Sequence, residues 1–154
     1  SAAESLEGMT LKNRWKVLKR IIPKKNSTGG YFSVCYEVED NSKKDKYWIS
    51  LSCKFEQKEF YAVLPTSKLD KYFNKSDTYI IKNGSSKYFS VDTLLNFSNI
   101  QITSKDKIEN AFNNSKFKYL GLLEKQHQTE IEKIIQDSIT LSQKMIDKLL
   151  CKYS

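Results

Sequence analysis

The chain of 154 residues carries 26 Lys and Arg against 18 Asp and Glu, a formal net charge of +8 at pH 7. This length suits one domain with a real core and an appended helix. No apolar run approaches the roughly 18 residues that span a bilayer, so we expect an intracellular protein with no membrane partner. Cys35, Cys53 and Cys151 are odd in number and the chain has a single His, which argues against a zinc site or a secreted disulfide framework.

The excess positive charge is unevenly distributed along the chain. Residues 124–152 hold five acids and five bases, whereas residues 9–123 hold 21 bases and 11 acids, a net charge of +10. A uniform solubilising charge would not separate in this way. The distribution therefore favours a surface that binds a polyanion.

The first predicted strand, over residues 13–23, is strongly basic. Between Thr10 and Tyr36 the chain has seven cationic side chains and no acid, with aromatic residues among them. Such a strand suits single-stranded nucleic acid, because cations neutralise phosphates and rings stack on bases. The alternative is that solvated edge strands simply favour Lys. The cations predicted to bind are Lys16, Lys19, Arg20, Lys24 and Lys25.

Two further strands are predicted over residues 31–40 and 46–55, joined by a charged turn. In the second of them Ile49 and Leu51 point inward, which leaves Trp48 and Lys54 facing outward. An outward Trp beside Lys favours a platform on which bases stack. The alternative is that Trp48 packs under a loop or against the C-terminal helix.

The middle of the chain predicts short elements. Residues 56–64 fit either a strand or a helix. A short helix is predicted over 67–73, followed by strands over 77–82 and 87–91 with a turn at 83–86, and by a last strand over 99–103. Ser104 is the predicted N-cap of a helix over 105–112.

A long helix is predicted over residues 119–150, because apolar side chains recur there near a period of 3.6. This stripe exceeds what a small β domain needs, so the helix is predicted to bind a partner subunit, with extra core as the alternative. The predicted interface residues are Ile131, Ile135, Ile139, Met145, Ile146 and Leu149. The predicted domains are a β part over 9–110 and a helical, oligomerising part over 111–154. Residues 1–8 resemble a tag remnant outside the fold.

Patterns that could support catalysis are weak. His127, the sole His, is predicted to lie on the surface, since nothing in the sequence places an orienting carboxylate or a reacting group beside it. Asp40 or Asp45, followed by Glu56 and Lys58, has the acid, gap and acid-x-Lys spacing of metal-dependent nucleases, in which two carboxylates hold a divalent ion. In so charged a chain this spacing arises easily by chance. No catalytic residue, metal or cofactor is therefore predicted.

The order of the predicted elements can be compared with known folds. It runs through residues 14–20 (RWKVLKR), 32–40 (FSVCYEVED), 47–51 (YWISL), 69–73 (LDKYF), 77–82 (DTYIIK), the pair Tyr88 and Phe89, and 99–103 (NIQIT). Over roughly residues 12–110 this order resembles the OB-fold of replication protein A and its telomeric paralogues. The resemblance implies a mainly β fold with a C-terminal α part: a five-stranded OB-type barrel followed by a long C-terminal helix.

The resemblance also implies a function. It is that of a non-catalytic subunit that binds single-stranded nucleic acid, with DNA favoured, in a nuclear complex of replication or telomere capping. By position, Trp48 and Lys54 match the contacts of the family's third strand, and Tyr88 or Phe89 matches its loop aromatic. The C-terminal helix would join a partner subunit. Two other functions stay open: a small metal-dependent nuclease or ribonuclease toxin, and a scaffold subunit that only binds proteins.

Overall fold

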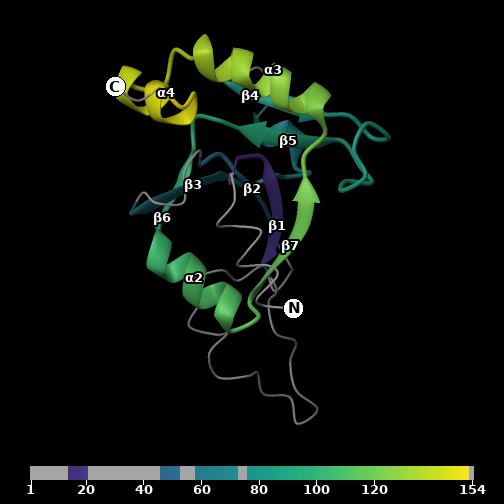
Figure 1. Ribbon diagram of the computed structural model, residues 1–154. Coiled ribbons are helices and arrows are strands. Elements are labelled where there is room, and N and C mark those ends of the chain that lie inside the picture. Colours follow the sequence, from purple (N-terminus) through teal and green to yellow (C-terminus); the bar gives the residue numbers. More distant parts are fainter. Residues whose placement is uncertain (1–13, 21–45, 53–57, 73–75, 153–154) are drawn as a thin grey trace.

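The computed structural model describes residues 14–20, 46–52, 58–72 and 76–152 (Figure 1). Its centre is a sheet of five antiparallel strands: β1 (Lys16–Arg20), β2 (Lys46–Ser50), β3 (Glu59–Val63), β6 (Gln101–Ser104) and β7 (Phe117–Leu122). The remaining elements are the hairpin of β4 (Thr78–Ile81) and β5 (Thr93–Asn96), the short 3-10 helix η2 (Leu69–Tyr72), and the helices α2 (Lys105–Asn113), α3 (Lys125–Gln136) and α4 (Gln143–Leu149). The described part is therefore mainly β, as predicted.

Several predicted elements are confirmed. β1, β2, β4 and β6 overlap predicted strands, and η2 lies within the predicted short helix. The residues that fitted either a strand or a helix contain β3. α2 begins after Ser104, whose hydroxyl accepts a hydrogen bond from the backbone N–H of Lys107 at 3.3 Å. The strand predicted over 31–40 lies outside the described residues.

The sheet is open, so the prediction of a closed OB-type barrel is wrong. The strand order is β6-β3-β2-β1-β7, and each neighbouring pair is antiparallel. The two edge strands β6 and β7 consequently run in the same direction, and strands that run in the same direction need a crossover connection. α2 supplies this crossover, and β4 pairs with β5 in a separate sheet that does not close the first one.

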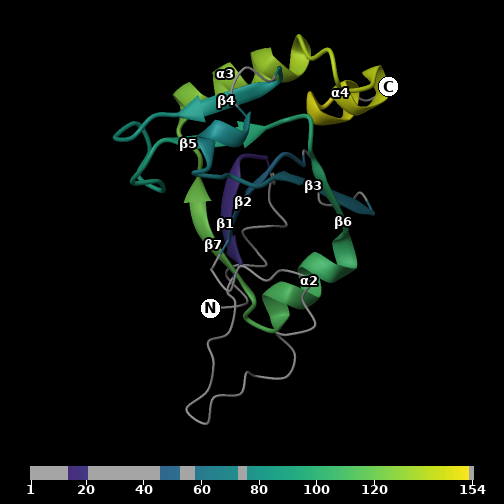
Figure 2. The ribbon, with the colours of Figure 1, turned by 180° about the vertical axis from the view of Figure 1, so that it is seen from behind.

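Each face of the sheet is covered by other elements. Side chains alternate along a strand, so Leu18, Trp48 and Phe60 point to the same side, where they pack with Ile108 and Phe112 of α2. The neighbouring residues point to the opposite side, where they pack with the hairpin, α3 and α4. This larger core includes Val17, Ile49, Tyr61, Val63, Ile81, Leu95, Ile131, Ile135, Ile146 and Leu149. Figures 1 and 2 show the sheet between α2 on one side and the hairpin with α3 and α4 on the other.

The prediction of one continuous helix over residues 119–150 is wrong. Its first part is the strand β7, which pairs with β1, and its remainder is divided between α3 and α4. The polar segment between these helices ends at Ser142, whose hydroxyl caps α4 by accepting from the backbone N–H of Met145 at 3.1 Å. None of the helices among the described residues is both long and apolar enough to cross a membrane.

The return strand predicted over 87–91 is also wrong, because β5 begins two residues later, at Thr93. The connection between β4 and β5 is instead held by side chains. The carboxylate of Asp92 accepts from the backbone N–H of Asn83 at 2.7 Å, and the hydroxyl of Ser85 donates to the carbonyl of Lys82 at 2.6 Å. These bonds use backbone groups that a longer strand ladder would have paired.

Candidate nucleic-acid interface

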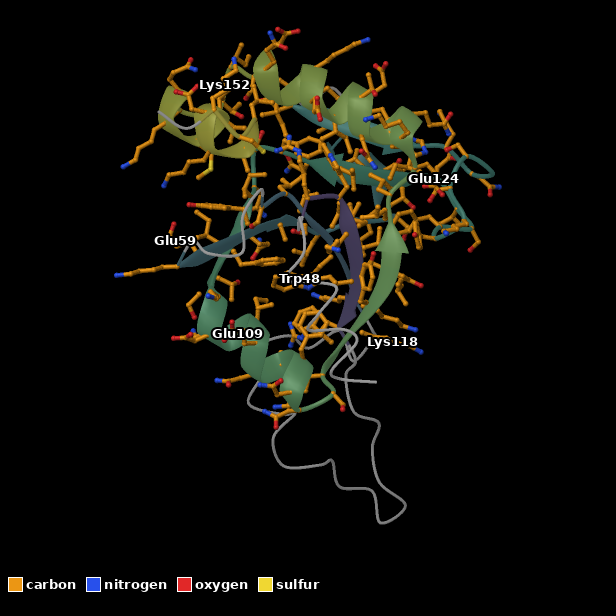
Figure 3. All side chains as sticks on the ribbon, viewed as in Figure 1. Trp48, Glu59, Glu109, Lys118, Glu124 and Lys152 are labelled. Carbon is orange, nitrogen blue, oxygen red and sulfur yellow. The ribbon has the colours of Figure 1, made fainter. Side chains whose placement is uncertain are left out.

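Cationic residues are clustered at one end of the three neighbouring strands β2, β1 and β7. Because side chains alternate along a strand, Lys19 and Lys118 point to one face of the sheet and Arg20 and Lys46 point to the other. The register places Lys19 of β1 directly opposite Lys118 of β7, and Arg20 of β1 directly opposite Lys46 of β2. Like charges at directly opposite positions disfavour each other. The four side chains are at least partly exposed to solvent, and Lys118 projects outward from β7 (Figure 3). This arrangement, hereafter the basic end, concentrates positive charge that separate stretches of sequence contribute.

An aromatic ring lies beside the basic end. Tyr47 is the neighbour of Lys19 on β2, and the ammonium of Lys19 lies 6.0 Å from the centre of its ring. The Tyr47 ring also packs against Phe89, with ring centres 5.3 Å apart and a T-shaped arrangement. Tyr47 is half-buried. Cations with an adjacent ring are the combination that single strands bind.

Trp48 does not face solvent, so the prediction of an exposed stacking platform is wrong. Its side chain is 8% exposed and lies between the sheet and α2 (Figure 3). The indole packs edge-on against Phe117, with ring centres 5.2 Å apart, and is stacked on Phe60 at 6.4 Å. The face predicted to be solvated is covered by α2. The alternation of residues within β2 cannot predict this contact, because α2 is distant in the sequence. Trp48 is a core residue.

Tyr88 and Phe89, the predicted loop aromatics, have different environments. Phe89 is buried in the larger core. Tyr88 is half-buried, and its hydroxyl donates to the carbonyl of Leu122 on β7 at 2.7 Å. It crosses β7 at Gly121, whose φ of +147° suits glycine and where a Cβ would collide with the Tyr88 hydroxyl. The ammonium of Lys87 lies 5.2 Å from the centre of the Tyr88 ring.

Lys16, predicted to bind phosphate, is 5% exposed. Its ammonium lies 4.8 Å from the centre of the Tyr119 ring, a cation–π contact with a residue of β7. Burial lowers the pKa of the Lys16 ammonium. Lys16 is therefore separate from the basic end and has an environment of its own. Lys24, Lys25 and Lys54 lie outside the described residues, as do Asp40, Asp45 and Glu56 of the nuclease-like pattern.

The predicted partner-binding stripe is part of the core of this chain. Ile131, Ile135, Ile146 and Leu149 are buried in the larger core, and Met145 is packed against it. Ile139, at 82% exposed, is the exception, and it lies in the segment between α3 and α4. The idea of a surplus apolar face is therefore wrong for these buried positions. Because α3 and α4 both pack on the sheet, they bury apolar side chains that a single long helix would have exposed to water.

His127 is buried, at 3% exposed, where the sequence predicted a surface residue. Its Nε2 lies 2.9 Å from the carbonyl oxygen of Ser85, which can only accept, so Nε2 carries the proton. Nδ1 then accepts from the hydroxyl of Tyr79 at 2.7 Å. Both nitrogens are used to tie the hairpin to α3, and the nearby Ser85 hydroxyl is not activated by them. The buried position of His127 depends on its tertiary contact with Tyr79, which the sequence does not show.

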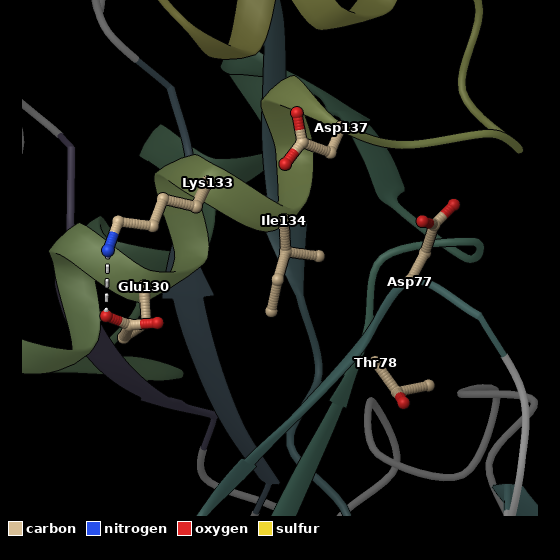
Figure 4. A pocket seen from close by; sticks show the side chains of 6 residues that line it. All are labelled: Asp77, Thr78, Glu130, Lys133, Ile134 and Asp137. Carbon is tan, nitrogen blue, oxygen red and sulfur yellow. Dashed lines mark hydrogen bonds and ion pairs between the residues drawn. The ribbon is translucent and has the colours of Figure 1, made fainter.

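A small pocket of about 240 Å³ lies between β4 and α3 (Figure 4). Asp77, Glu130 and Asp137 line it, and Glu130 is paired with Lys133 at 3.3 Å. Partial burial acts to raise the pKa of the Asp77 carboxyl, but hydrogen bonds from Ser138 and Thr140 outweigh it and hold that pKa below its usual range. No group of three potential metal ligands occurs among the described residues. The Asp77 carboxylate anchors the segment after α3.

The end of α4 is tied to the start of β1. The guanidinium of Arg14 donates to the carbonyl of Leu149 and to Sγ of Cys151, and it lies 3.9 Å from the Glu132 carboxylate. Cys151 is disulfide-bonded, which the count of cysteines did not predict. Disulfides of this kind are rare in cytosolic and nuclear proteins. These contacts fix α4 against the sheet.

Comparison of the chain with protein-family models, with curated proteins and with solved structures found no match.

Proposed function

We propose that this protein binds single-stranded nucleic acid through the basic end of its sheet, without catalysing a reaction on it. The observation that carries the proposal is the pairing of Lys19 with Lys118 and of Arg20 with Lys46 on three adjacent strands. These four cations, two on each face at the end of the sheet, can each neutralise a phosphate and release its counterions. The half-buried Tyr47, which shares the face of Lys19 and Lys118, offers a ring on which a base can stack.

The charge of the whole chain supports the same proposal. The net charge of +8 raises the rate and strength of encounters with polyanions of any kind. At the basic end this positive charge is locally concentrated, because the fold brings Lys19 and Lys118 together from segments almost one hundred positions apart in the sequence. The nuclear location and the link to replication or telomere complexes come from the sequence resemblance alone and stay predictions.

The test is a titration of labelled oligo-dT by fluorescence anisotropy at two salt concentrations, with and without Mg²⁺. Lys19→Met and Lys118→Met together keep the apolar stems and remove two charges. Each lost phosphate contact reduces the slope of log K against log salt by about 0.7 for a single strand. The double variant should therefore bind more weakly, with a slope smaller by about 1.4.

The matched control is Lys144→Met with Lys152→Met. Both of these residues are exposed, and they lie in and after α4, far from Lys118 (Figure 3). Equal losses in the two double variants would show that net charge acts without the basic end and would refute the proposed site. Mg²⁺-dependent shortening of the oligonucleotide would establish the nuclease instead, and absence of binding to oligo-dT and oligo-rU would favour the scaffold subunit.

A further inference from the structure

A groove lies between the outer edge of β4 and the helix α3, which run alongside each other in Figures 1 and 2. The pocket of about 240 Å³ beside Asp77 is one part of it (Figure 4), and a second pocket of about 480 Å³ lies beside Tyr79 and Lys82. Glu130 lines both pockets, so the two adjoin. Both are open to solvent, which gives a ligand access to this side of β4.

The two sides of the groove are equal in length and run in opposite directions. On the strand side the lining extends from Asp77 to Lys82, five positions or roughly 16 Å at about 3.3 Å per residue. On the helix side it extends from Gln126 to Asp137, eleven positions or roughly 16 Å at about 1.5 Å per residue. Asp77 and Asp137 line the same pocket, and Lys82 lines the other pocket with Gln126. This region, hereafter the β4–α3 groove, therefore has the length of a short strand.

The outer edge of β4 offers backbone hydrogen bonds to the groove. Leu94 of β5 uses both its N–H and its C=O in bonds to Thr66, which lies on the side of β5 away from β4. Leu94 is the register partner of Ile80, so these two residues exchange no hydrogen bonds, and the N–H and C=O of Ile80 point away from β5. Neither group has a hydrogen-bond partner among the described residues. Since no described residue of β5 lines the two pockets, the groove lies on the side to which these groups point.

We infer that the β4–α3 groove binds an extended peptide of a partner protein, which adds to the outer edge of β4 as an antiparallel strand. An unpaired strand edge is a template for such an addition, in which main-chain bonds give affinity and side-chain contacts give specificity. The central residue of the peptide exchanges two hydrogen bonds with Ile80 and places its side chain beside that of Ile80, which is half-buried. The inference goes beyond the proposed function, because the groove contains none of the cations of the basic end.

The charges of the groove indicate which peptide it fits. At one end Asp137 adds a second carboxylate beside Asp77, and at the other end Lys82 is an exposed cation. Glu130, between them, is already paired with Lys133 at 3.3 Å. In an antiparallel strand the second residue before the central one lies opposite Lys82, and the third residue after it lies opposite Asp77. A complementary peptide therefore has an acid at the first of these positions and a base at the second.

An NMR titration of the isotope-labelled chain with the peptide acetyl-Glu-Thr-Val-Thr-Val-Lys-amide tests the inference. The peptide should shift the amide signals of β4 and α3, and that of Ile80 should move downfield because its N–H gains a hydrogen bond. The control peptide acetyl-Lys-Thr-Val-Thr-Val-Glu-amide has the same composition and net charge with the two charged residues exchanged. It should bind roughly fivefold more weakly.

A second pair of peptides tests the main-chain bonds. The first Val lies opposite Ile80, so N-methylation of this Val removes one bond to β4 and should weaken binding roughly fivefold. The N–H of the second Thr points away from β4. N-methylation of this Thr is therefore the matched control and should weaken binding less. Equal losses from the two N-methylated peptides would show that the peptide does not extend the sheet and would overturn the inference.

Lys82→Glu tests the charge order from the side of the protein. Lys82 is exposed, so its replacement should leave the fold intact, and it should abolish the preference between the two charged peptides. Lys144→Glu makes the same change of charge on α4, outside the groove, and should keep the preference. The inference is overturned if neither peptide binds the wild-type chain, if both bind it equally, or if the amide signal of Ile80 stays unmoved. Binding of oligo-dT at the basic end is measured separately, so the two proposals can fail independently.

Discussion

Replacing Trp48 by Ala should destabilise the protein severely, because the indole is 8% exposed and packs on Phe60 and Phe117. A buried Trp removes about 200 Å² from water. At about 25 cal/mol per Å² this burial is worth about 5 kcal/mol, and measured costs of Trp→Ala in cores are about 3–5 kcal/mol. For a domain of this size each kcal/mol corresponds to about 2–4 °C. The melting temperature should fall by roughly 6–20 °C.

Urea denaturation followed by far-UV circular dichroism measures this cost, with an unchanged slope m as evidence that the two end states are the same. Trp48→Phe is the matched variant. The indole N–H of Trp48 is buried and has no hydrogen-bond partner in the described part of the chain, so Phe loses contacts but also removes an unsatisfied polar group. It should cost less than half as much as Ala. A Trp48→Ala variant that melts within a degree of wild type would refute the placement of Trp48 in the core.

Two further predictions concern the loops. Ser115 follows Asn114, the C-cap of α2, and has φ of +58°, a conformation that glycine adopts without strain. Ser115→Gly should therefore stabilise the protein by about 0.5–1 kcal/mol. Asn114→Gly, at φ of −95°, should destabilise it, and urea midpoints measure both effects. Asp77→Asn should cost about 1 kcal/mol at pH 7, because a carboxylate accepts the hydrogen bonds of Ser138 and Thr140 more strongly than an amide. The pKa of Asp77 is lowered in the folded state. The loss of stability caused by Asp77→Asn should therefore have its full value at pH above the unfolded pKa of about 3.9, and it should disappear as pH falls through the lower folded pKa.

The strands were predictable where alternation is local. In β1 and β2 the residues Val17 and Ile49 do point to one core, and the N-cap Ser104 marks the start of α2 correctly. The alternation of apolar and polar residues in a strand cannot predict which element covers the other face of the sheet. Trp48 was assigned to solvent because the sequence gives no sign that α2 packs there, almost sixty positions later. The error is one of tertiary contact, not of strand assignment.

The C-terminal helices show a different limit. Apolar residues spaced by three or four positions continue from Ile131 to Leu149, so a window finds one helix where there are two. The interruption is signalled only by the polar segment that ends at the cap Ser142. For β7, the decisive feature is Gly121, with φ of +147° opposite Val17, beside an irregularity in the pairing with β1. A search for helical periodicity detects neither of these two features, so it does not identify β7 as a strand.

The candidate site was predictable in part. Composition singled out the cations of β1, and Lys19 and Arg20 do lie at the end of a strand. Their partners Lys46 and Lys118 were not singled out, because only the register of β1 with β2 and β7 places them opposite. The sequence therefore located the basic strand without locating the basic surface.

The covered sheet restricts how a nucleic acid can bind. Proteins that bind single strands on an open sheet face need that face in water, but in this chain α2 covers one side and the hairpin with α3 and α4 covers the other. A ligand is then left with the strand ends and the edges. Of the two edge strands, β7 carries Lys118 and Tyr119 and adjoins the cations of β1, whereas β6 (Gln101–Ser104) has no charged residue. The distribution of charge between the two edges thus favours binding at the β7 edge, beside the basic end.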